Sequence, residues 1–310
     1  MKGPPNAERP TLGILLMVGF ALTAPLMDSF AKMIGDALAV GQVAAARFAI
    51  QAALLVPLAL ALGCLHRPGR AEMGLHLIRA ALILTATAFF FYSLRYMPIA
   101  DAIAIFFVEP FILTLLGALL LGEAIGVRRI LACAVGFMGA LLIIQPTFVD
   151  IGLVALAPLV TALLFAFYMI LTRKMAQRMH PITLQTYTGL AALVIAIPIL
   201  TIFNGSGVTE LDPSWPATRE LWLLLGLGII ATLSHICISY ALSFAPASTI
   251  APIHYLEIVS ATALGFWIFG DLPDGLSIIG IALIVSSGFY VFLRERKMEM
   301  AIERRIPPQP

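Results

Sequence analysis

The chain has 310 residues, 61% of which are hydrophobic, and its 24 glycines bring the apolar share to about 69%, against roughly 45–50% in a soluble domain. Charged residues make up 12%, the net charge is +2 and the mean hydropathy is +1.00. This composition excludes a soluble, disordered or fibrous protein, and so small a net charge gives no reason to expect a nucleic-acid partner. The three cysteines lie far apart without a Cys-x-x-Cys spacing, which favours packing residues over a redox pair or a metal site.

A helix needs roughly 20 mostly apolar residues to cross a membrane. Ten runs of about that length follow one another along the chain, between breaks made by proline, glycine and charged residues. They are residues 11–33, 43–62, 75–94, 102–121, 127–145, 152–172, 183–203, 221–243, 247–269 and 275–293. We therefore expect an all-α membrane protein with ten transmembrane helices, whose longest loop, at residues 204–220, leaves no room for a soluble domain.

Lysine and arginine are distributed unequally between alternate loops. One side, which includes both tails, holds fourteen: Lys2, Arg9, Arg67, Arg70, Arg128, Arg129, Arg173, Lys174, Arg178, Arg294, Arg296, Lys297, Arg304 and Arg305. The other side holds three, Lys32, Arg95 and Arg219. Because short cytoplasmic loops carry the excess, we expect a multi-pass protein of the inner membrane with both termini in the cytoplasm. The alternative is a signal peptide cleaved near Ala24, which would leave nine spans.

The chain contains an internal repeat. A shift of 148 residues aligns residues 92–122 with 240–270 without a gap, and nine of the 31 pairs are identical. Each copy holds five spans, and because five is odd, the second copy enters the membrane upside down relative to the first. We expect an N-terminal tail at 1–10, a first five-helix repeat at 11–146, a second at 147–293 and a C-terminal tail at 294–310. Inverted repeats recur in secondary transporters, with the substrate site between them.

Both copies carry the same short pattern: a tyrosine near a helix end, a proline turn, a helix with a central glutamate and a glycine-acid pair that closes this helix. The residues are Tyr92, Pro98, Val108-Glu109-Pro110 and Gly122-Glu123, then Tyr240, Pro246, Leu256-Glu257 and Gly270-Asp271. The duplicated pattern resembles the drug/metabolite transporter superfamily, in its ten-helix EamA-type branch. The second copy has Ile258 where the first has Pro110, and Pro252 stands five residues before Glu257, so we expect its backbone break elsewhere.

The resemblance implies two inverted five-helix halves around a central cavity, lined chiefly by the first, third and fourth helices of each half. It also implies transport by alternating access of a small polar or aromatic, amino-acid-like metabolite, with export favoured over uptake. An uptake carrier for a larger metabolite such as riboflavin or S-adenosylmethionine is the alternative. No cofactor is expected, protons are a candidate for the coupling ion, and both a monomer and a homodimer stay open.

Charged residues inside apolar runs cost about 2.5–3.5 kcal/mol each on insertion scales, so each needs a partner, a water-filled cavity or a function. Asp28 and Lys32 stand four residues apart, which allows a same-face pair near the outer end of the first run. Arg47 is expected to anchor the second run, to pair with Asp28 or Glu109, or to contact substrate. Arg79, one turn from the cytoplasmic end of the third run, is expected to extend its charge to the interface.

Glu109 and Glu257 are the central candidates. Pro110 removes a backbone N–H and frees a carbonyl about one turn earlier, which favours a helix break that faces the cavity. Glu257 is the repeat mate of Glu109, so both carboxyls are expected near the midplane. His254 lies three residues before Glu257 on the same helix face, and the pair can exchange protons or bind a cationic amine. Each of these groups can instead bond a neighbouring helix.

Aromatic residues at similar heights can complete a pocket for an organic solute. The candidates are Tyr92, Tyr96, Phe106, Phe107, Tyr168, Tyr240, Tyr255 and Trp267. The residues that we expect to bind substrate or to couple transport are Arg47, Tyr92, Phe106, Glu109, Tyr168, Tyr240, His254 and Glu257. His235, Gly136, Gly139 and Gly280 are expected to serve packing.

An intramembrane enzyme and a channel are the competing classes. The spacing of His254 and Glu257 suits a metal, but the His-Glu-x-x-His of a zinc protease is absent and two ligands are too few, so no metal and no catalytic residue is expected. A Gly-x-Ser-x-Gly motif, a phosphate loop and a repeated filter loop are also absent. The sequence therefore favours a carrier of a small molecule, embedded in the lipid bilayer.

Overall fold

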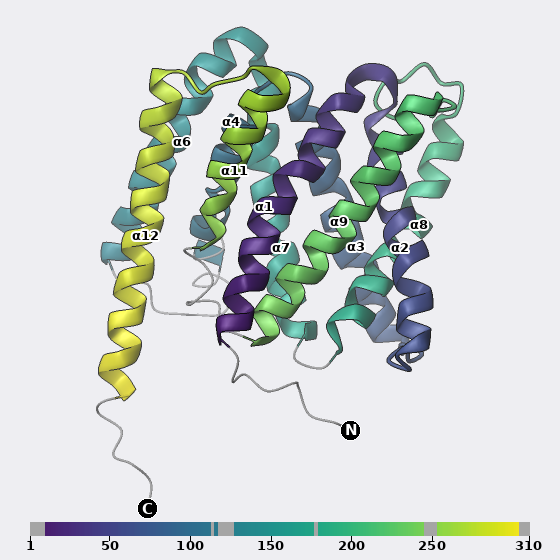
Figure 1. The fold of residues 1–310 in the computed structure, drawn as a ribbon, viewed down its shortest axis with the longest axis horizontal. Helices are drawn as coiled ribbons and strands as arrows, with labels where there is room; N and C mark the ends of the chain where they lie inside the picture. Colours follow the sequence, from purple (N-terminus) through teal and green to yellow (C-terminus); the bar gives the residue numbers. More distant parts are fainter. Residues whose placement is uncertain (1–9, 113–114, 117–126, 177–178, 245–252, 304–310) are drawn as a thin grey trace, which may run out of the picture.

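The chain folds into a bundle of helices in the computed structural model, which describes residues 10–112, 115–116, 127–176, 179–244 and 253–303 (Figure 1). Within these ranges every regular element is helical and there is no strand. The all-α class expected from the sequence is therefore confirmed. Several residues named above lie outside the described ranges: Lys2, Arg9, Arg178, Arg304, Arg305, Gly122, Glu123, Pro246 and Pro252.

The helices run up and down the bundle, and α1 begins at the end of the bundle where α12 ends (Figure 1). The α-helices are α1 (Pro10–Ile34), α2 (Val40–Ala61), α3 (Arg70–Leu94), α4 (Ile99–Phe106), α6 (Val127–Ile151), α7 (Ala157–Ala176), α8 (Pro181–Phe203), α9 (Thr218–Phe244), α11 (Leu256–Leu264) and α12 (Gly275–Glu303). Short 3-10 helices follow α1 and α6, η1 (Gly35–Ala37) and η2 (Gly152–Leu156), and a π-helix, η3 (Gly265–Phe269), extends α11. In the described part of the chain, six helices are long and apolar enough to cross a membrane, and three further apolar helices are shorter.

Helices that are distant in the sequence make the most extensive contacts. The helix α1 packs against α9, α3 against α7, α2 against α8 and α6 against α12. Apolar side chains fill these contacts, and Phe48 and Leu94 are at most 1% exposed. Large apolar side chains also cover the outside, where Val194 and Ile202 are 65% and 75% exposed. Because water does not solvate such a surface well and lipid does, the bundle has the exterior of a multi-pass membrane protein.

Two glycines allow α6 and α12 to approach closely. A Cβ atom added to Gly139 would lie 2.8 Å from the carbonyl oxygen of Gly280, and one added to Gly280 would lie 2.6 Å from the carbonyl oxygen of Gly139. Gly136 likewise leaves room for the ring of Phe111. The packing role predicted for these three glycines is confirmed, and it is the role that small residues have between membrane helices.

Two helices are interrupted directly before the paired glutamates. The helix α4 ends at Phe106, residues 107–108 form a turn, and helix resumes at Glu109. In the second half, residues 253–254 are helical, Tyr255 forms a turn, and α11 follows. The expectation that the second break lies elsewhere is therefore wrong. Phe107 and Tyr255 are repeat mates, and their rings stack with centroids 5.1 Å apart and 29° between planes.

Each turn contains a backbone hydrogen bond to a carbonyl three residues back, although the two bonds lie at different positions of the repeat. The N–H of Val108 donates to the carbonyl of Ile105, three residues back, and the N–H of Ile258 donates to the carbonyl of Tyr255, both at 3.2 Å. Such bonds wind a helix more tightly than the usual four-residue bonds. Pro110 accounts for the first turn because it lacks an N–H. Ile258 has one, so contacts of the Tyr255 ring, with the other turn and with α12, take the place of a second proline.

Gly280→Ala is expected to destabilise the protein by about 1–3 kcal/mol, because the added methyl group must push α6 and α12 apart. Thermal unfolding of the purified protein in detergent measures this change as a lower Tm. Gly74→Ala is the matched control, since it adds the same group to α3 where nothing lies within 4 Å, and it should leave Tm unchanged or raise it. An equal fall in Tm in the two variants would contradict the close approach of α6 and α12.

Candidate substrate-binding cavity

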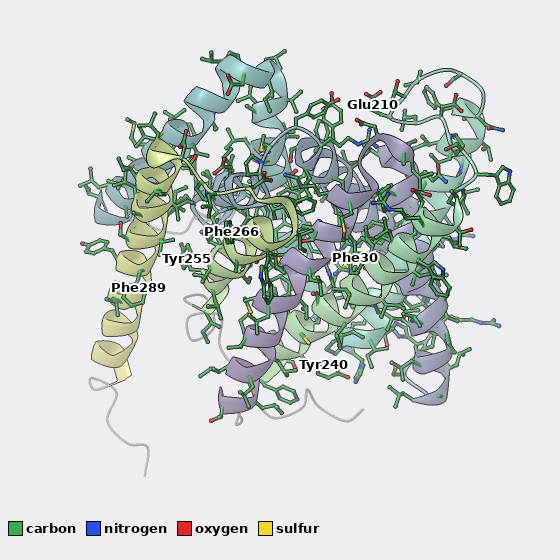
Figure 2. The ribbon with its side chains drawn as sticks, turned by 45° about the horizontal axis from the view of Figure 1, so that its top comes forward. Phe30, Glu210, Tyr240, Tyr255, Phe266 and Phe289 are labelled. Carbon is green, nitrogen blue, oxygen red and sulfur yellow. The ribbon has the colours of Figure 1, made fainter. Side chains whose placement is uncertain are left out.

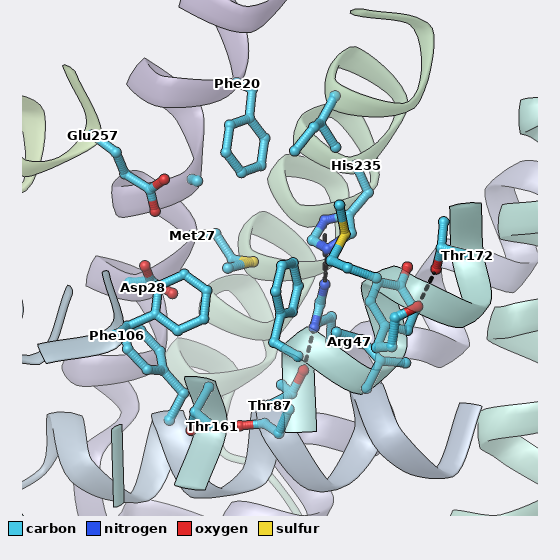
Figure 3. A pocket seen from close by; sticks show the side chains of 18 of the residues that line it. Phe20, Met27, Asp28, Arg47, Thr87, Phe106, Thr161, Thr172, His235 and Glu257 are labelled. Carbon is cyan, nitrogen blue, oxygen red and sulfur yellow. Dashed lines mark hydrogen bonds between the residues drawn. The ribbon is translucent and has the colours of Figure 1, made fainter. Parts of the chain in front are cut away.

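A cavity lies inside the bundle (Figure 3). It contains about 890 Å³ of space that no atom fills, counting its open side. The wall consists of several residues each from α1, α3, α7 and α9, one residue each from α2, α4, α8 and α11, and His254 just before α11. Most of this wall is apolar, and two groups of polar side chains are set into it. We call Arg47 with Thr87 and His235 the guanidinium pole, and Asp28 with Glu257 the carboxylate pole.

Arg47 of α2 forms the centre of the guanidinium pole and is 2% exposed. Its Nη1 donates to the hydroxyl oxygen of Thr87 at 2.5 Å, and its Nη2 lies 2.8 Å from Nε2 of His235. Nδ1 of His235 lies 2.9 Å from the carbonyl oxygen of Ala231. A neutral imidazole with its proton on Nδ1 satisfies both contacts, because Nδ1 then donates to the carbonyl and Nε2 accepts from Arg47.

Both partners of Arg47 are therefore neutral. No carboxylate in the described part of the chain lies within ion-pair distance of it, so the pairing with Asp28 or Glu109 that the sequence allowed is not formed. His235, which was expected only to pack, instead holds the guanidinium in place. Thr87 and His235 are repeat mates at the spacing of 148 residues, so Arg47 lies between equivalent positions of α3 and α9.

The carboxylate pole begins with Asp28 of α1, which is 2% exposed and lines the cavity. The expected pair with Lys32 is wrong, because Nζ of Lys32 donates to Oδ2 of Asp271 at 2.7 Å and to the carbonyl of Met97 at 3.0 Å. Gly270, with φ at 75°, ends the preceding helix and brings Asp271 within reach. Asp28 Oδ1 has no hydrogen-bond partner among the described residues.

Glu257 of α11 completes this pole and is 5% exposed. Nε2 of His254 lies 2.9 Å from Oε2 of Glu257, so the three-residue spacing does bring the two groups together. Neither atom is aligned for a hydrogen bond with any described residue. The His254 ring contacts Phe20 and Phe107, with centroids 5.4 and 4.9 Å away. Figure 3 shows Asp28 and Glu257 on one side of the cavity, and Arg47, His235 and Thr172 on the opposite side.

Glu109 is buried outside the cavity wall. It is 6% exposed, it is not among the lining residues, and its Oε1 has no hydrogen-bond partner within the described ranges. It interacts electrostatically with His254. Of the two repeat-mate glutamates, Glu257 lines the cavity and Glu109 does not.

A second buried arginine, Arg79 of α3, connects three helices beside the cavity. It donates to the hydroxyl of Tyr168 at 2.7 Å and of Thr172 at 2.8 Å in α7, and to the hydroxyl of Thr188 and the carbonyl of Leu184 in α8. The expectation that its charge extends to the interface is wrong, because these acceptors satisfy the guanidinium inside the protein. The network also fixes Tyr168, whose ring lies under the guanidinium at 4.6 Å.

Of the eight aromatic candidates, two line the cavity: Phe106 from α4 and Tyr168 from α7. The ring of Phe106 meets that of Phe165 edge-on, with centroids 5.3 Å apart. Tyr92 and Tyr240 lie outside the wall, near the last turns of α3 and α9, and Figure 2 shows Tyr240 near one end of the bundle. Their repeat relationship reflects equivalent helix ends and not a shared pocket.

Seven polar residues of the wall were not among the expected site residues: Asp28, Thr87, Thr161, Thr172, Gln185, His235 and Ser239. Gln185 of α8 donates from Nε2 to the hydroxyl of Ser239 at 3.1 Å. One signal was available for Thr87, because its repeat mate His235 is also polar within an apolar run. A polar residue at equivalent positions of both copies indicates a shared environment.

A bundle with a lipid-compatible exterior and charged side chains around an internal cavity is the architecture of a membrane transporter. The chain belongs to the EamA-like transporter family, whose sequence profile matches residues 11–145 and 152–293. The resemblance noted from the sequence is thereby confirmed. Because the proteins of this family move solutes, the chain is a transporter and not an enzyme.

The chain is 28% identical to a riboflavin transporter of Vibrio cholerae, over 94% of this chain and 96% of the relative. It is 29% identical to the pseudopaline exporter CntI of Pseudomonas aeruginosa, over 88% and 93%. A third relative is an S-adenosylmethionine uptake transporter of Rickettsia prowazekii, 23% identical over 92% and 94%. One solved crystal structure, 21% identical, has the same fold with a TM-score of 0.60 over 94% of this chain and 98% of its own.

Glu109→Gln is expected to lower the initial transport rate while membrane abundance stays near the parent level, because the amide keeps the shape of the buried side chain but can neither ionise nor exchange a proton. Flux into vesicles, divided by the amount of protein, measures the effect. Glu72→Gln is the control, since that carboxyl lies in the first turn of α3, far from the cavity wall. A fall in flux that only follows a fall in abundance would contradict a role in transport.

Proposed function

We propose that the protein is a secondary transporter of the inner membrane that exports a small polar or aromatic, amino-acid-like metabolite by alternating access. The cavity is the observation that carries this proposal. It is enclosed by helices from both halves of the chain, its wall is mostly apolar, and its few charged groups are buried. Such a combination suits a small organic solute, because apolar contacts supply affinity and a few polar groups fix orientation. An open pore would instead need a continuous hydrophilic path.

We further propose ten spans, arranged as two inverted repeats at residues 11–146 and 147–293. The packing supports this when α1, α2, α3 and α6 are matched with α7, α8, α9 and α12. The contact of α1 with α9 then corresponds to that of α7 with α3, and the contact of α2 with α9 to that of α8 with α3. The pairs α2 with α8 and α6 with α12 each correspond to themselves. A pseudo-two-fold axis in the membrane plane requires this pattern.

Both termini are proposed to be cytoplasmic. Figure 1 places the beginning of α1, the loop between α2 and α3, the beginning of α6 and the end of α12 at one end of the bundle. The positive residues at that end include Arg67, Arg70, Arg128, Arg129, Arg294, Arg296 and Lys297. The opposite end has Lys32, Arg95 and Arg219. The excess of positive residues supports a cytoplasmic assignment for the first end.

Uptake of a larger metabolite is the second candidate. Two of the relatives above are named for riboflavin and S-adenosylmethionine, whereas the third is named as an exporter. Direction and substrate are therefore tested together. An untargeted comparison of metabolites in the medium and the cytosol, between overexpressing and deleted cells, identifies the solute and the direction in which the protein moves it.

Purified protein in liposomes is expected to give saturable flux of that solute and counterflow against a preloaded pool. Flux that rises linearly to high concentration would contradict a carrier and support a pore. Empty liposomes and liposomes with heat-denatured protein are the controls.

Protons are a candidate coupling ion, because His254 lies beside Glu257 and near Glu109, and Asp28 faces the same cavity. An imposed proton gradient is expected to stimulate flux through the parent protein more than through His254→Gln, since glutamine does not exchange a proton. Initial rates are measured between about pH 5 and pH 9, a range that includes the ordinary pKa of a histidine side chain. Equal stimulation of the two proteins would contradict coupling through His254.

A further inference from the structure

The cavity carries carboxyl groups on one side and a guanidinium group on the other. Asp28 and Arg47 both line it, and no ion pair joins them among the described residues. Their separation therefore exceeds the 4.0 Å of a direct ion pair. Carboxyl groups and a guanidinium group that face one cavity without direct contact form a pattern that a ligand with a cationic and an anionic group can complement.

The carboxylate pole lacks a cationic partner of its own. Lys32, the nearest lysine on α1, is engaged by Asp271. Asp28 is almost fully buried, and its Oδ1 has no hydrogen-bond partner in the described part of the chain. In the described part of the chain, His254 is the one basic side chain within ion-pair distance of Glu257. A buried carboxyl oxygen without a donor is costly, and a ligand that donates to it removes that cost.

The guanidinium pole, in turn, lacks an anionic partner among the described residues. Thr87 and His235 hold the two terminal nitrogens of Arg47 without adding negative charge, and Nε has no partner among the described residues. Its net positive charge is therefore available to an anionic group that enters the cavity. Guanidinium suits a carboxylate or a similar oxyanion because its donors lie in one plane.

The wall between the poles is apolar. Phe20 and Met27 of α1 lie between the carboxylate pole and the guanidinium pole, and Phe106 of α4 lies beside Asp28 (Figure 3). These side chains favour an organic body over hydrated ions. A metal ion is also disfavoured, since the described residues contain no group of three histidine, cysteine or acidic side chains arranged for one.

We propose that the substrate is a dipolar organic metabolite, whose cationic group binds Asp28 and Glu257 and whose anionic group binds Arg47. Asp28 is then a specificity-determining residue that selects for positive charge. This inference rests on the proposed transport function. A solute with a single charge would leave one pole without a counter-charge in an apolar environment, whereas a dipolar solute matches both.

The first test sorts the metabolites whose distribution depends on the protein by their charged groups at neutral pH. We expect them to carry a cationic and an anionic group. If no metabolite depends on the protein, the proposed function fails and this inference fails with it. If the metabolites are neutral or carry one kind of charge, transport stands and the dipolar inference is overturned.

The second test uses the leading solute and two derivatives as competitors of flux in liposomes. Acetylation neutralises the amine of one derivative, and amidation neutralises the carboxylate of the other. Against the parent protein, each derivative should compete at least about tenfold less well than the solute, as expected for the loss of one charge-assisted contact.

The variants identify which pole binds the cationic group of the solute and which pole binds the anionic group. The apparent affinity of Asp28→Asn for the solute should fall about tenfold. Its affinity for the acetylated derivative should change little, so the variant should no longer prefer the solute over this derivative. Arg47→Gln should likewise lose the preference for the solute over the amidated derivative. Arg47→Lys keeps the positive charge and should retain part of this preference. Asp101→Asn is the matched control, because Asp101 is a buried carboxyl outside the cavity wall and should leave both preferences intact. If Asp28→Asn weakens the solute and the acetylated derivative equally, its role is structural and the proposal is overturned.

Discussion

The cost of burying charge inside an apolar bundle is the constraint on which the rest of this structure depends. A buried charged group needs partners from the protein itself, because lipid offers none. Arg79 receives them from two neighbouring helices, so its charge becomes an anchor that joins α3 to α7 and α8. Arg47 and Asp28 are also buried, but their surroundings leave part of their bonding capacity unused. The difference between these groups separates the scaffold of the protein from its site.

Much of the fold follows from the sequence, because apolar runs of membrane-spanning length correspond to helices. Pro110 also indicates the first interruption, since a missing N–H acts locally. The second interruption at Tyr255 could not be predicted in the same way. It has no adjacent proline in the described segment, and it depends on a ring from the other half of the chain and on the space beside Gly288 in α12. Local sequence does not contain such long-range contacts.

The site was predictable in its residue types and less so in its partners. Ionisable residues in apolar runs were correctly singled out as the groups that need an explanation, and Glu257 with His254 are indeed adjacent. Helical spacing, however, states only which residues share a face. It placed Lys32 beside Asp28, whereas a residue 239 positions away takes the lysine. This tertiary partner leaves Asp28 free to face the cavity, and spacing within one helix carries no information about it.

The stack of Phe107 on Tyr255 joins the two interrupted helices at equivalent points. Each ring belongs to the turn itself, two residues before a buried glutamate, so neither turn can rotate without displacing the ring of the other. The hydroxyl of Tyr255 also occupies the space that a side chain at Gly288 would fill, which fixes that ring against α12. The stack thus adds a direct link between the two interrupted helices, and a movement of one turn would have to carry the ring of the other turn with it or break the stack.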